Sequence, residues 1–260
     1  MTRRDTPWPA GTPCWVDLMT VDLAASQAFY NDILGWEFTP GIAEFGGYCQ
    51  ATADGIPVAG MSPMMPGMED APHAWTVYLA TDDLATTDAA AVAAGGQRLS
   101  EPMAIGDLGS MGLWLGPGGS AFGAWQSGVH TGFRSYDEPG TVIWCDLMTP
   151  AYAESLTFYA ATFGYTYAAV DMGGAQYSMV TVPGGERPAA GIGLRSETDP
   201  GVPGWSTTFQ VADVDAATER VRTASGFVLV EPYDFQFGRM STVSGRDGEI
   251  FSLMTPAPWS

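Results

Sequence analysis

The spacing of hydrophobic and polar residues predicts how the chain begins. Residues 13–20 alternate with the two-residue period of a strand, with Trp15, Asp17 and Met19 on one face. Apolar residues at helical spacing then run to Leu34, and Gly35 suits a C-terminal helix cap. Short strands are expected next, near 36–39, 46–53 and 56–61. The first unit therefore has the order strand, helix, strand, strand, strand.

The same order of elements recurs along the chain. The first half continues with a predicted strand from 76, a helix over 83–94 and strands near 97–100, 108–115 and 120–126. After a polar, turn-rich stretch, the second half is predicted to have a strand at 141–148, a helix over 152–163 and strands near 165–170, 174–182 and 188–194. The last unit has a strand from 206, a helix over 213–224 and a final strand at 249–255. The pattern predicts an α+β protein with four βαβββ units.

A direct sequence repeat supports this reading. The stretch Trp15-Val16-Asp17-Leu18-Met19-Thr20 returns as Trp144-Cys145-Asp146-Leu147-Met148-Thr149. A weaker inner repeat relates Leu18, Asp22 and Gly35 to Leu79, Asp83 and Gly96. We therefore predict two domains, 1–126 and 141–260, joined by a linker at 127–140.

The composition narrows the classes of partner. The chain has no lysine and ten Arg against 29 Asp plus Glu, giving a net charge of −19. Such a surface repels phosphate backbones and anionic lipid, so we expect neither a nucleic-acid nor a membrane partner. No apolar run approaches the ~18 residues of a membrane span, and no hydrophobic signal core follows the N-terminus, so a cytoplasmic protein is expected. Three Cys without CxxC spacing suggest neither a disulfide framework nor a zinc site.

A motif in the first unit resembles a known family. It reads Asp22-Leu23-x-x-Ser26-x-x-Phe29-Tyr30-x-x-x-Leu34-Gly35, and its echo is Ser155-x-x-Phe158-Tyr159-x-x-x-Phe163-Gly164. Together with the four-unit plan, this resembles the vicinal oxygen chelate superfamily of glyoxalase I, extradiol dioxygenases and bleomycin-resistance proteins. The chain is also similar to a two-domain glyoxalase-like or "hydroxylase" group, which includes a mycobacterial antigen and accessory proteins of aromatic polyketide antibiotic pathways. The resemblance implies two tandem domains, each a cupped mixed sheet.

The resemblance also implies where a metal would bind. Metal-dependent members take His, Gln or Glu ligands from the first strand of each unit and from the last strand of the domain. By register these positions fall on Trp15, Thr76 and Gly123, and on Trp144, Ser206 and Ser252. None of them is a His or a carboxylate, and the two His of the chain, His73 and His130, lie in separate segments. We therefore expect neither a metal nor another cofactor.

Aromatic, methionine and polar side chains would line the cups in place of a metal. Aromatic faces can stack a flat ligand, and Met adapts to irregular apolar shapes. The candidate ligand-binding residues are Trp15, Tyr48, Met61, Met64, Met65, Tyr78, Trp125, Trp144, Tyr177, Ser206, Gln210 and Arg239. The Met61–Met68 stretch is a candidate lid, or alternatively a packing segment. The alternative for Trp15 and Trp144 is that the indoles plug cups whose active sites have been lost.

Asp17 and Asp146 are the candidate catalytic residues. A carboxylate facing inward beside an indole is costly unless it is hydrogen-bonded or solvated, and desolvation would raise its pKa. Such a group can act as a general base or pair with an amino-sugar cation. The alternative is a structural Asp bonded to neighbouring backbone N–H groups.

Three functions follow from these residues. The first is a metal-free binding protein for a hydrophobic or aromatic small molecule, such as an antibiotic or a biosynthetic intermediate that it sequesters or presents to a partner enzyme. The second is a metal-independent isomerase, cyclase or lyase in natural-product biosynthesis, with an inward Asp as acid or base. The third is a metal-dependent glyoxalase- or dioxygenase-type enzyme.

Overall fold

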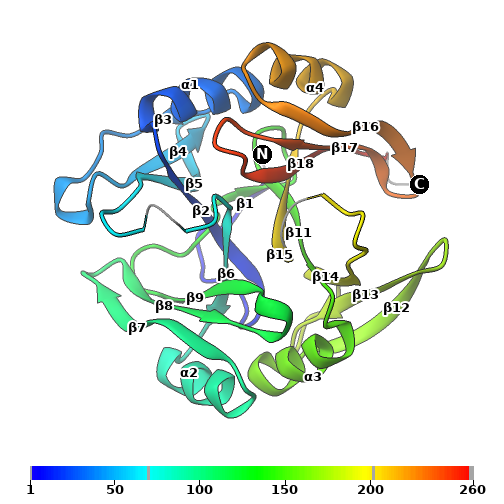
Figure 1. The fold of residues 1–260 in the computed structure, drawn as a ribbon. Coiled ribbons are helices and arrows are strands. Elements are labelled where there is room, and N and C mark those ends of the chain that lie inside the picture. Colours follow the sequence, from blue (N-terminus) through cyan, green and yellow to red (C-terminus); the bar gives the residue numbers. More distant parts are fainter. Residues whose placement is uncertain (1, 69–70, 201–202, 258–260) are drawn as a thin grey trace.

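Two eight-stranded mixed sheets form the body of the protein (Figure 1). The structure is a computed structural model that describes residues 2–68, 71–200 and 203–257. In both sheets the first strand of each half lies in the middle, parallel to one neighbour and antiparallel to the other. Each sheet therefore joins two βαβββ units edge to edge, as the repeat predicts, and the α+β fold is confirmed.

The first sheet has the strand order β3-β4-β5-β2-β6-β9-β8-β7. Its strands are β2 (Pro13–Thr20), β3 (Glu37–Phe38), β4 (Cys49–Ala53), β5 (Ile56–Pro63), β6 (Thr76–Thr81), β7 (Gln97–Ile105), β8 (Gly109–Leu115) and β9 (Ala121–Ser127). Helix α1 (Leu23–Leu34) follows β2, and α2 (Leu84–Ala93) follows β6. Two short 3₁₀ helices, η1 (Ala43–Phe45) and η2 (Pro117–Gly119), lie in connecting loops.

The second sheet repeats this order as β12-β13-β14-β11-β15-β18-β17-β16. Its strands are β11 (Val142–Thr149), β12 (Thr166–Met172), β13 (Ala175–Thr181), β14 (Ala190–Leu194), β15 (Gly204–Gln210), β16 (Phe227–Phe235), β17 (Gly238–Ser244) and β18 (Ile250–Pro256). Helix α3 (Tyr152–Phe163) follows β11, and α4 (Val214–Thr223) follows β15. The expected linker also contains a short strand, β10 (Ser135–Tyr136), which pairs with β1 (Thr2–Arg3). The division into 1–126, 127–140 and 141–260 stays a proposal.

Local side chains fix the ends of the helices. Asp22, Asp83 and Asp213 each accept a hydrogen bond from the backbone N–H three residues ahead, so three of the four helices have an Asp N-cap. Helices α1 and α3 end at Gly35 and Gly164, which adopt the left-handed conformation that glycine tolerates best. In the described part of the chain, no helix is long and apolar enough to cross a membrane.

Helices from different halves pair on the outside of the molecule. Helix α1 packs against α4, and α2 packs against α3, so each half supplies one helix to each pair (Figure 1). Aromatic rings fill the space beneath both pairs. Trp36 lies 5.2 Å from Phe209 between ring centroids, and Phe122 lies 5.4 Å from Tyr159. The main hydrophobic core is therefore shared by the two sheets and is not confined to one of them.

Equivalent hairpins cross between the halves but carry different chemistry. The β17–β18 hairpin carries Asp247, whose carboxylate accepts hydrogen bonds from the Thr20 hydroxyl at 2.7 Å and from the Val21 backbone N–H at 2.8 Å. From the same hairpin, buried Glu249 accepts a hydrogen bond from the Tyr30 hydroxyl at 2.8 Å. In the other half the equivalent hairpin carries uncharged Gly118 and Ser120. Of these two described hairpins, the one that carries Asp247 and Glu249 thus joins the halves through charged side chains, and its equivalent does so without them.

Candidate functional site

The inward face of each sheet carries the same pair of hydrogen-bonded aromatic residues. The Trp15 indole N–H donates to the Tyr48 hydroxyl at 2.9 Å, and the Trp144 indole N–H donates to the Tyr177 hydroxyl at 3.0 Å. The members of each pair are 33 residues apart in both halves. The structure therefore brings four of the candidate residues together as two equivalent pairs.

A glycine beneath each tyrosine makes this pairing possible. Gly60 is the register partner of Asp17, and Gly191 is the register partner of Asp146. A Cβ atom at either glycine would overlap the tyrosine hydroxyl above it. Each cup therefore has a tyrosine hydroxyl lying across a glycine beside an inward carboxylate.

The two carboxylates lie in poorly solvated surroundings. Burial raises the pKa of Asp17 to about 7, against a smaller lowering effect of a hydrogen bond from the Tyr78 hydroxyl. Burial likewise raises the pKa of Asp146 to about 6, and the Tyr177 hydroxyl donates to it at 3.4 Å. Both groups titrate much closer to neutral pH than an ordinary Asp does.

The first cup is filled by aromatic side chains, two of them from the expected linker. The His130 ring packs edge-on against Trp15, with 4.4 Å between ring centroids, and the Phe133 ring lies 5.6 Å from the same indole. Trp125 holds this segment, because its indole N–H donates to the His130 carbonyl oxygen at 2.9 Å. Trp15 is left only 4% exposed and Phe133 only 4% exposed. For Trp15 the geometry therefore favours the plug.

The second cup keeps its aromatic residues accessible. Trp144 and Tyr177 are half-buried, and Tyr233 is 39% exposed. Strand register places Tyr233, Met240, Met254 and Gln210 in one row across four neighbouring strands, on the same face as Trp144 and Thr208. At the rim, the Gln236 amide lies 3.2 Å from the Met172 sulfur, so the two edge hairpins of the curled sheet touch. The inward face of the curled second sheet thus carries aromatic, methionine and polar side chains together.

Comparisons with known proteins agree with this geometry. Residues 141–253 match the Glyoxalase/Bleomycin resistance protein/Dioxygenase superfamily, and residues 13–48 match the family described as Bleomycin resistance protein-like N-terminal. The protein named "Putative glyoxylase CFP32" from Mycobacterium bovis is 37% identical over 95% of this chain and 96% of its own length. The chain belongs to this superfamily.

Other relatives within the superfamily differ in what they are named for. "Anthracycline biosynthesis protein DnrV" from Streptomyces peucetius is 33% identical over 96% of this chain and 94% of its own length. Among solved structures, the Mn(II)-bound glyoxalase from Novosphingobium aromaticivorans shares 17% identity, with a TM-score of 0.65 over 94% of this chain and 82% of that one. The 2,3-dioxygenase LapB from Pseudomonas sp. KL28 shares 14% identity, with a TM-score of 0.66 over 98% and 96%. These two structures confirm the tandem fold of the superfamily.

The residues at the superfamily's metal positions do not fit a divalent ion. Trp15 and Trp144 use their indole N–H groups as donors, so neither offers a lone pair to a metal. Gly123, at the last-strand position, lies beneath the Tyr78 ring. Among the described residues, no group of three or more His, Cys, Asp or Glu side chains could hold a metal. Any chemistry in these cups therefore has to come from other residues.

Replacing Gly123 by alanine should destabilise the first domain. A Cβ atom there would overlap the Tyr78 ring, which forms part of the filled cup. Overpacking of this kind costs about 1–3 kcal/mol, measurable by chemical denaturation. The control is Ser252→Ala at the equivalent position of the second domain, whose cross-strand partner is Thr208 in place of Tyr78. This change adds no atom and removes one 3.3 Å hydroxyl contact with Thr242, so the loss should be about 1 kcal/mol. Equal losses in the two variants would contradict this account of the filled cup.

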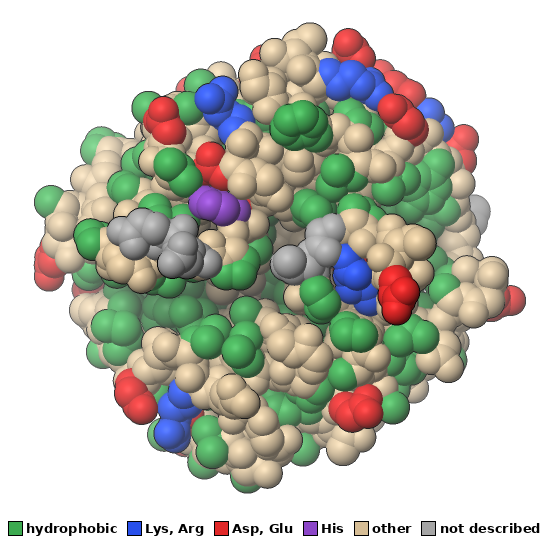
Figure 2. Space-filling model, in the orientation of Figure 1, with side chains coloured by type: hydrophobic (Ala, Val, Ile, Leu, Met, Phe, Trp, Pro, Cys, Tyr) green, Lys and Arg blue, Asp and Glu red, His purple; other side chains and the backbone are tan. Residues whose placement is uncertain are grey.

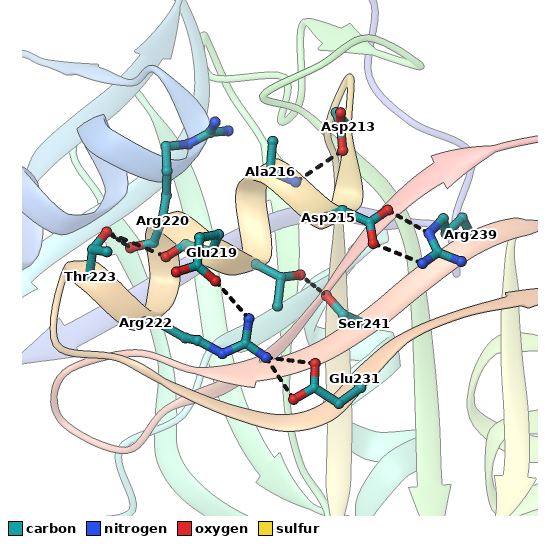
Figure 3. A network of polar contacts seen from close by, with 11 residues as sticks. Asp213, Asp215, Ala216, Glu219, Arg220, Arg222, Thr223, Glu231, Arg239 and Ser241 are labelled. Atoms are coloured by element: carbon teal, nitrogen blue, oxygen red, sulfur yellow. Dashed lines mark hydrogen bonds and ion pairs between the residues drawn. The ribbon is translucent and has the colours of Figure 1, made fainter.

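Two of the predicted binding residues lie away from the cups. Met61 is fully buried in register with Leu18 and Cys49, and the Gln27 amide on α1 reaches the Cys49 sulfur at 3.3 Å, so Met61 faces the helix. Arg239 lies beside Met240 on the opposite face of β17 and forms a two-pronged ion pair with Asp215 of α4, as Figure 3 shows. Met61 is thus part of strand β5 (Ile56–Pro63) and not of a lid, and the Arg239 guanidinium is paired outside the second cup.

The remaining candidates lie on or near the inward faces. Met64 follows β5 half-buried and Met65 is 53% exposed, while residues 69–70 beyond them lie outside the described residues. Tyr78 is opposite Trp15, and Ser206 is opposite Asp146. Figure 2 shows hydrophobic side chains across the middle of one face of the molecule, with acidic side chains mainly toward its outline.

Sequence reasoning missed three residues that shape the cups. His130 and Phe133 were read as part of a polar linker, although they cover Trp15. Tyr233 was not assigned to a strand. The nearest signal was the repeat of Glu101-Pro102 as Glu231-Pro232, which marks the strands from 97 and from 227 as equivalent.

Proposed function

We propose that this protein binds a hydrophobic, aromatic small molecule in its second cup, without a resident metal. The observation that carries the proposal is the difference between the cups. His130 and Phe133 cover Trp15 in the first cup, whereas Trp144 in the second cup is half-buried. Its indole is hydrogen-bonded to Tyr177, and Met240 and Met254 lie on the same face of the sheet. A concave, mostly apolar site with a few polar groups is the usual form of a small-molecule site.

The lining of the second cup suits a flat ligand. The Trp144 indole is fixed by its hydrogen bond to Tyr177, so stacking on it loses little side-chain freedom. Met148, Met179 and Met240 are half-buried on the same face of the sheet, and their flexible thioethers can adapt to an irregular apolar outline. Because a relative is named for anthracycline biosynthesis, aromatic polyketides are the first ligands to test. The role would be sequestration, resistance, or presentation of an intermediate to a biosynthetic enzyme.

Replacing Trp144 by phenylalanine should weaken binding of a planar polyketide chromophore such as 1,8-dihydroxyanthraquinone by roughly fivefold. The change removes part of the stacking surface and the hydrogen bond to Tyr177, and aromatic pairs contribute about 0.5–1.5 kcal/mol beyond area burial. Quenching of tryptophan fluorescence, checked by calorimetry, measures the affinity. It should not change when a chelator is added.

The matched control is Trp15→Phe, the same substitution at the repeat-equivalent position of the filled cup. It removes the equivalent hydrogen bond, to Tyr48, and should leave ligand affinity unchanged. Weaker binding in Trp15→Phe and normal binding in Trp144→Phe would place the ligand in the first cup and contradict this proposal. Absence of binding across a panel of aromatic polyketides would count against the proposal as a whole.

A second candidate function is metal-independent acid–base catalysis by Asp146. Its pKa of about 6 allows it to take up and release a proton near neutral pH. Asp17 is less suited to this role because His130 and Phe133 cover its cup. An isomerisation, cyclisation or lyase step would then be lost in Asp146→Asn while a neutral ligand still binds. Full turnover in that variant would rule Asp146 out as the acid or base.

A further inference from the structure

Asp146 is a poorly solvated carboxylate without a cationic partner. Within residues 2–68, 71–200 and 203–257 it forms no ion pair, and its carboxylate accepts only a 3.4 Å hydrogen bond from the Tyr177 hydroxyl and one from its own backbone N–H. Arg239 does not serve it, because Asp215 holds that guanidinium on the other face of β17 (Figure 3). Asp234 forms a second ion pair with the same guanidinium at 3.1 Å. A carboxylate in such surroundings is costly unless a donor or a cation compensates it.

Aromatic rings surround this carboxylate. Trp144 lies two residues before it on the same face of β11, and Tyr177 contacts it directly. Tyr233 approaches from the far edge of the curled sheet. Burial and then the nearby charge of Asp146 raise the pKa of its hydroxyl. Three ring-bearing side chains and one carboxylate therefore converge on the same space.

A second acceptor on the same face is without a donor. The Gln210 side-chain oxygen is buried and has no hydrogen-bond partner. Gln210 lies two residues after Thr208, the cross-strand partner of Trp144, so it belongs to the inward face. Buried acceptors of this kind usually have a partner, which here can come from a ligand donor.

We propose that the second cup recognises a protonated amine carried by the hydrophobic ligand, with the ammonium against Asp146 and beneath the rings of Trp144, Tyr177 and Tyr233. This inference rests on the proposed binding function and names the class of its ligand. An ammonium near aromatic faces gains a cation–π attraction, and a buried carboxylate is stabilised when a cation pairs with it. The net charge of −19 would also draw a cationic ligand toward the protein.

In the first cup the equivalent carboxylate, Asp17, has partners within the protein. Asp17 accepts a hydrogen bond from Tyr78, a residue that is replaced by Thr208 in the second cup. Ala80 stands where the second cup has Gln210, so this position carries no side-chain acceptor in the first cup. His130 and Phe133 then cover the site. Asp146 has neither a hydrogen bond from a tyrosine equivalent to Tyr78 nor a cover like the one that His130 and Phe133 form.

The test compares two probes that share one ring system and differ in a single polar group, which is charged in one and neutral in the other. 9-(Aminomethyl)anthracene carries an ammonium at pH 7.5, and 9-anthracenemethanol carries a neutral hydroxyl on the same ring system. At this pH Asp146 is ionised, since its pKa is about 6. Calorimetry should show that the amine binds the full-length protein at least about tenfold more tightly than the alcohol. In Asp146→Asn the preference should fall to about twofold or less, with the affinity for the alcohol retained.

Two further variants keep the result interpretable. Asp17→Asn is the matched control and should preserve the full preference for the amine. Tyr233→Leu removes one ring while leaving the carboxylate, and should weaken the amine more than the alcohol.

The possible outcomes distinguish failure of the amine inference from failure of the proposed binding function. Equal affinity for the two probes, or a preference that survives in Asp146→Asn, would overturn the amine inference and leave the binding function standing. Failure of both probes to bind would overturn both. Loss of the preference for the amine in Asp17→Asn would place the ammonium in the first cup and overturn the inference.

Discussion

Replacing Trp36 by alanine will lower the free energy of unfolding by about 3–5 kcal/mol, the usual range for removal of a buried tryptophan. Trp36 is fully buried. It stacks on Tyr30 at 5.4 Å and meets Phe209 of the other half at 5.2 Å between ring centroids. Its indole N–H donates to the Gly140 carbonyl oxygen at 2.7 Å, so the same side chain anchors the segment between the sheets. The loss should therefore weaken both halves together.

Chemical denaturation followed by circular dichroism gives the magnitude. The control is Trp36→Phe, which keeps a ring against Phe209 and removes the hydrogen bond to Gly140, so it should cost about half as much or less. A loss below about 1 kcal/mol in Trp36→Ala would contradict the idea of a core shared by the two sheets.

Replacing Asp17 by asparagine will stabilise the protein at pH 8 and leave its stability nearly unchanged at pH 4. The folded protein holds the pKa of Asp17 at about 7, whereas an unfolded Asp titrates near 3.9. Between those values the folded state binds a proton that the unfolded state has released. Stability of the native protein therefore falls as pH rises from about 4 to about 7, and is level above that.

Asparagine removes this penalty because it cannot ionise, while its amide oxygen can still accept the hydrogen bond from Tyr78. The gain should reach at most about 4 kcal/mol above pH 7, since one pKa unit corresponds to ~1.4 kcal/mol. Thermal melts at pH 4, 6 and 8 measure the trend. Asp146→Asn should follow the same direction with a smaller gain that levels off near pH 6. A gain that is constant with pH would refute the raised pKa of Asp17.

The fold could be predicted because its signals are local and repeated. The Trp-x-Asp-Leu-Met-Thr strands, the Asp before the helices and the glycines after α1 and α3 recur at fixed shifts, and each has a local physical reason. The inward direction of Trp15 and Asp17 also follows from strand alternation. The structure accordingly has the four predicted units in the predicted order.

The contents of the cups could not be predicted in the same way. His130 enters the first cup from an irregular segment, and no periodicity describes where such a segment runs. Strand β16 contains two register shifts, between Val228 and Val230 and between Val230 and Tyr233, so alternation fails just before the tyrosine that reaches the second cup. Met61 opens the methionine-rich stretch expected to form a lid, but strand β5 continues through it to Pro63 and turns its side chain toward helix α1.

The difference between the two equivalent hairpins makes the contact between the halves specific for unlike partners. A dimer of two C-terminal halves would bring Asp247 against Thr149 and Pro150, the repeat equivalents of Thr20 and Val21. Proline has no backbone N–H to donate, so the carboxylate would lose one of its two partners. Two N-terminal halves would instead present Gly118 to Thr20 and leave the Thr20 hydroxyl without its acceptor carboxylate. The observed pairing of unlike halves therefore keeps hydrogen bonds that a pairing of like halves would lose.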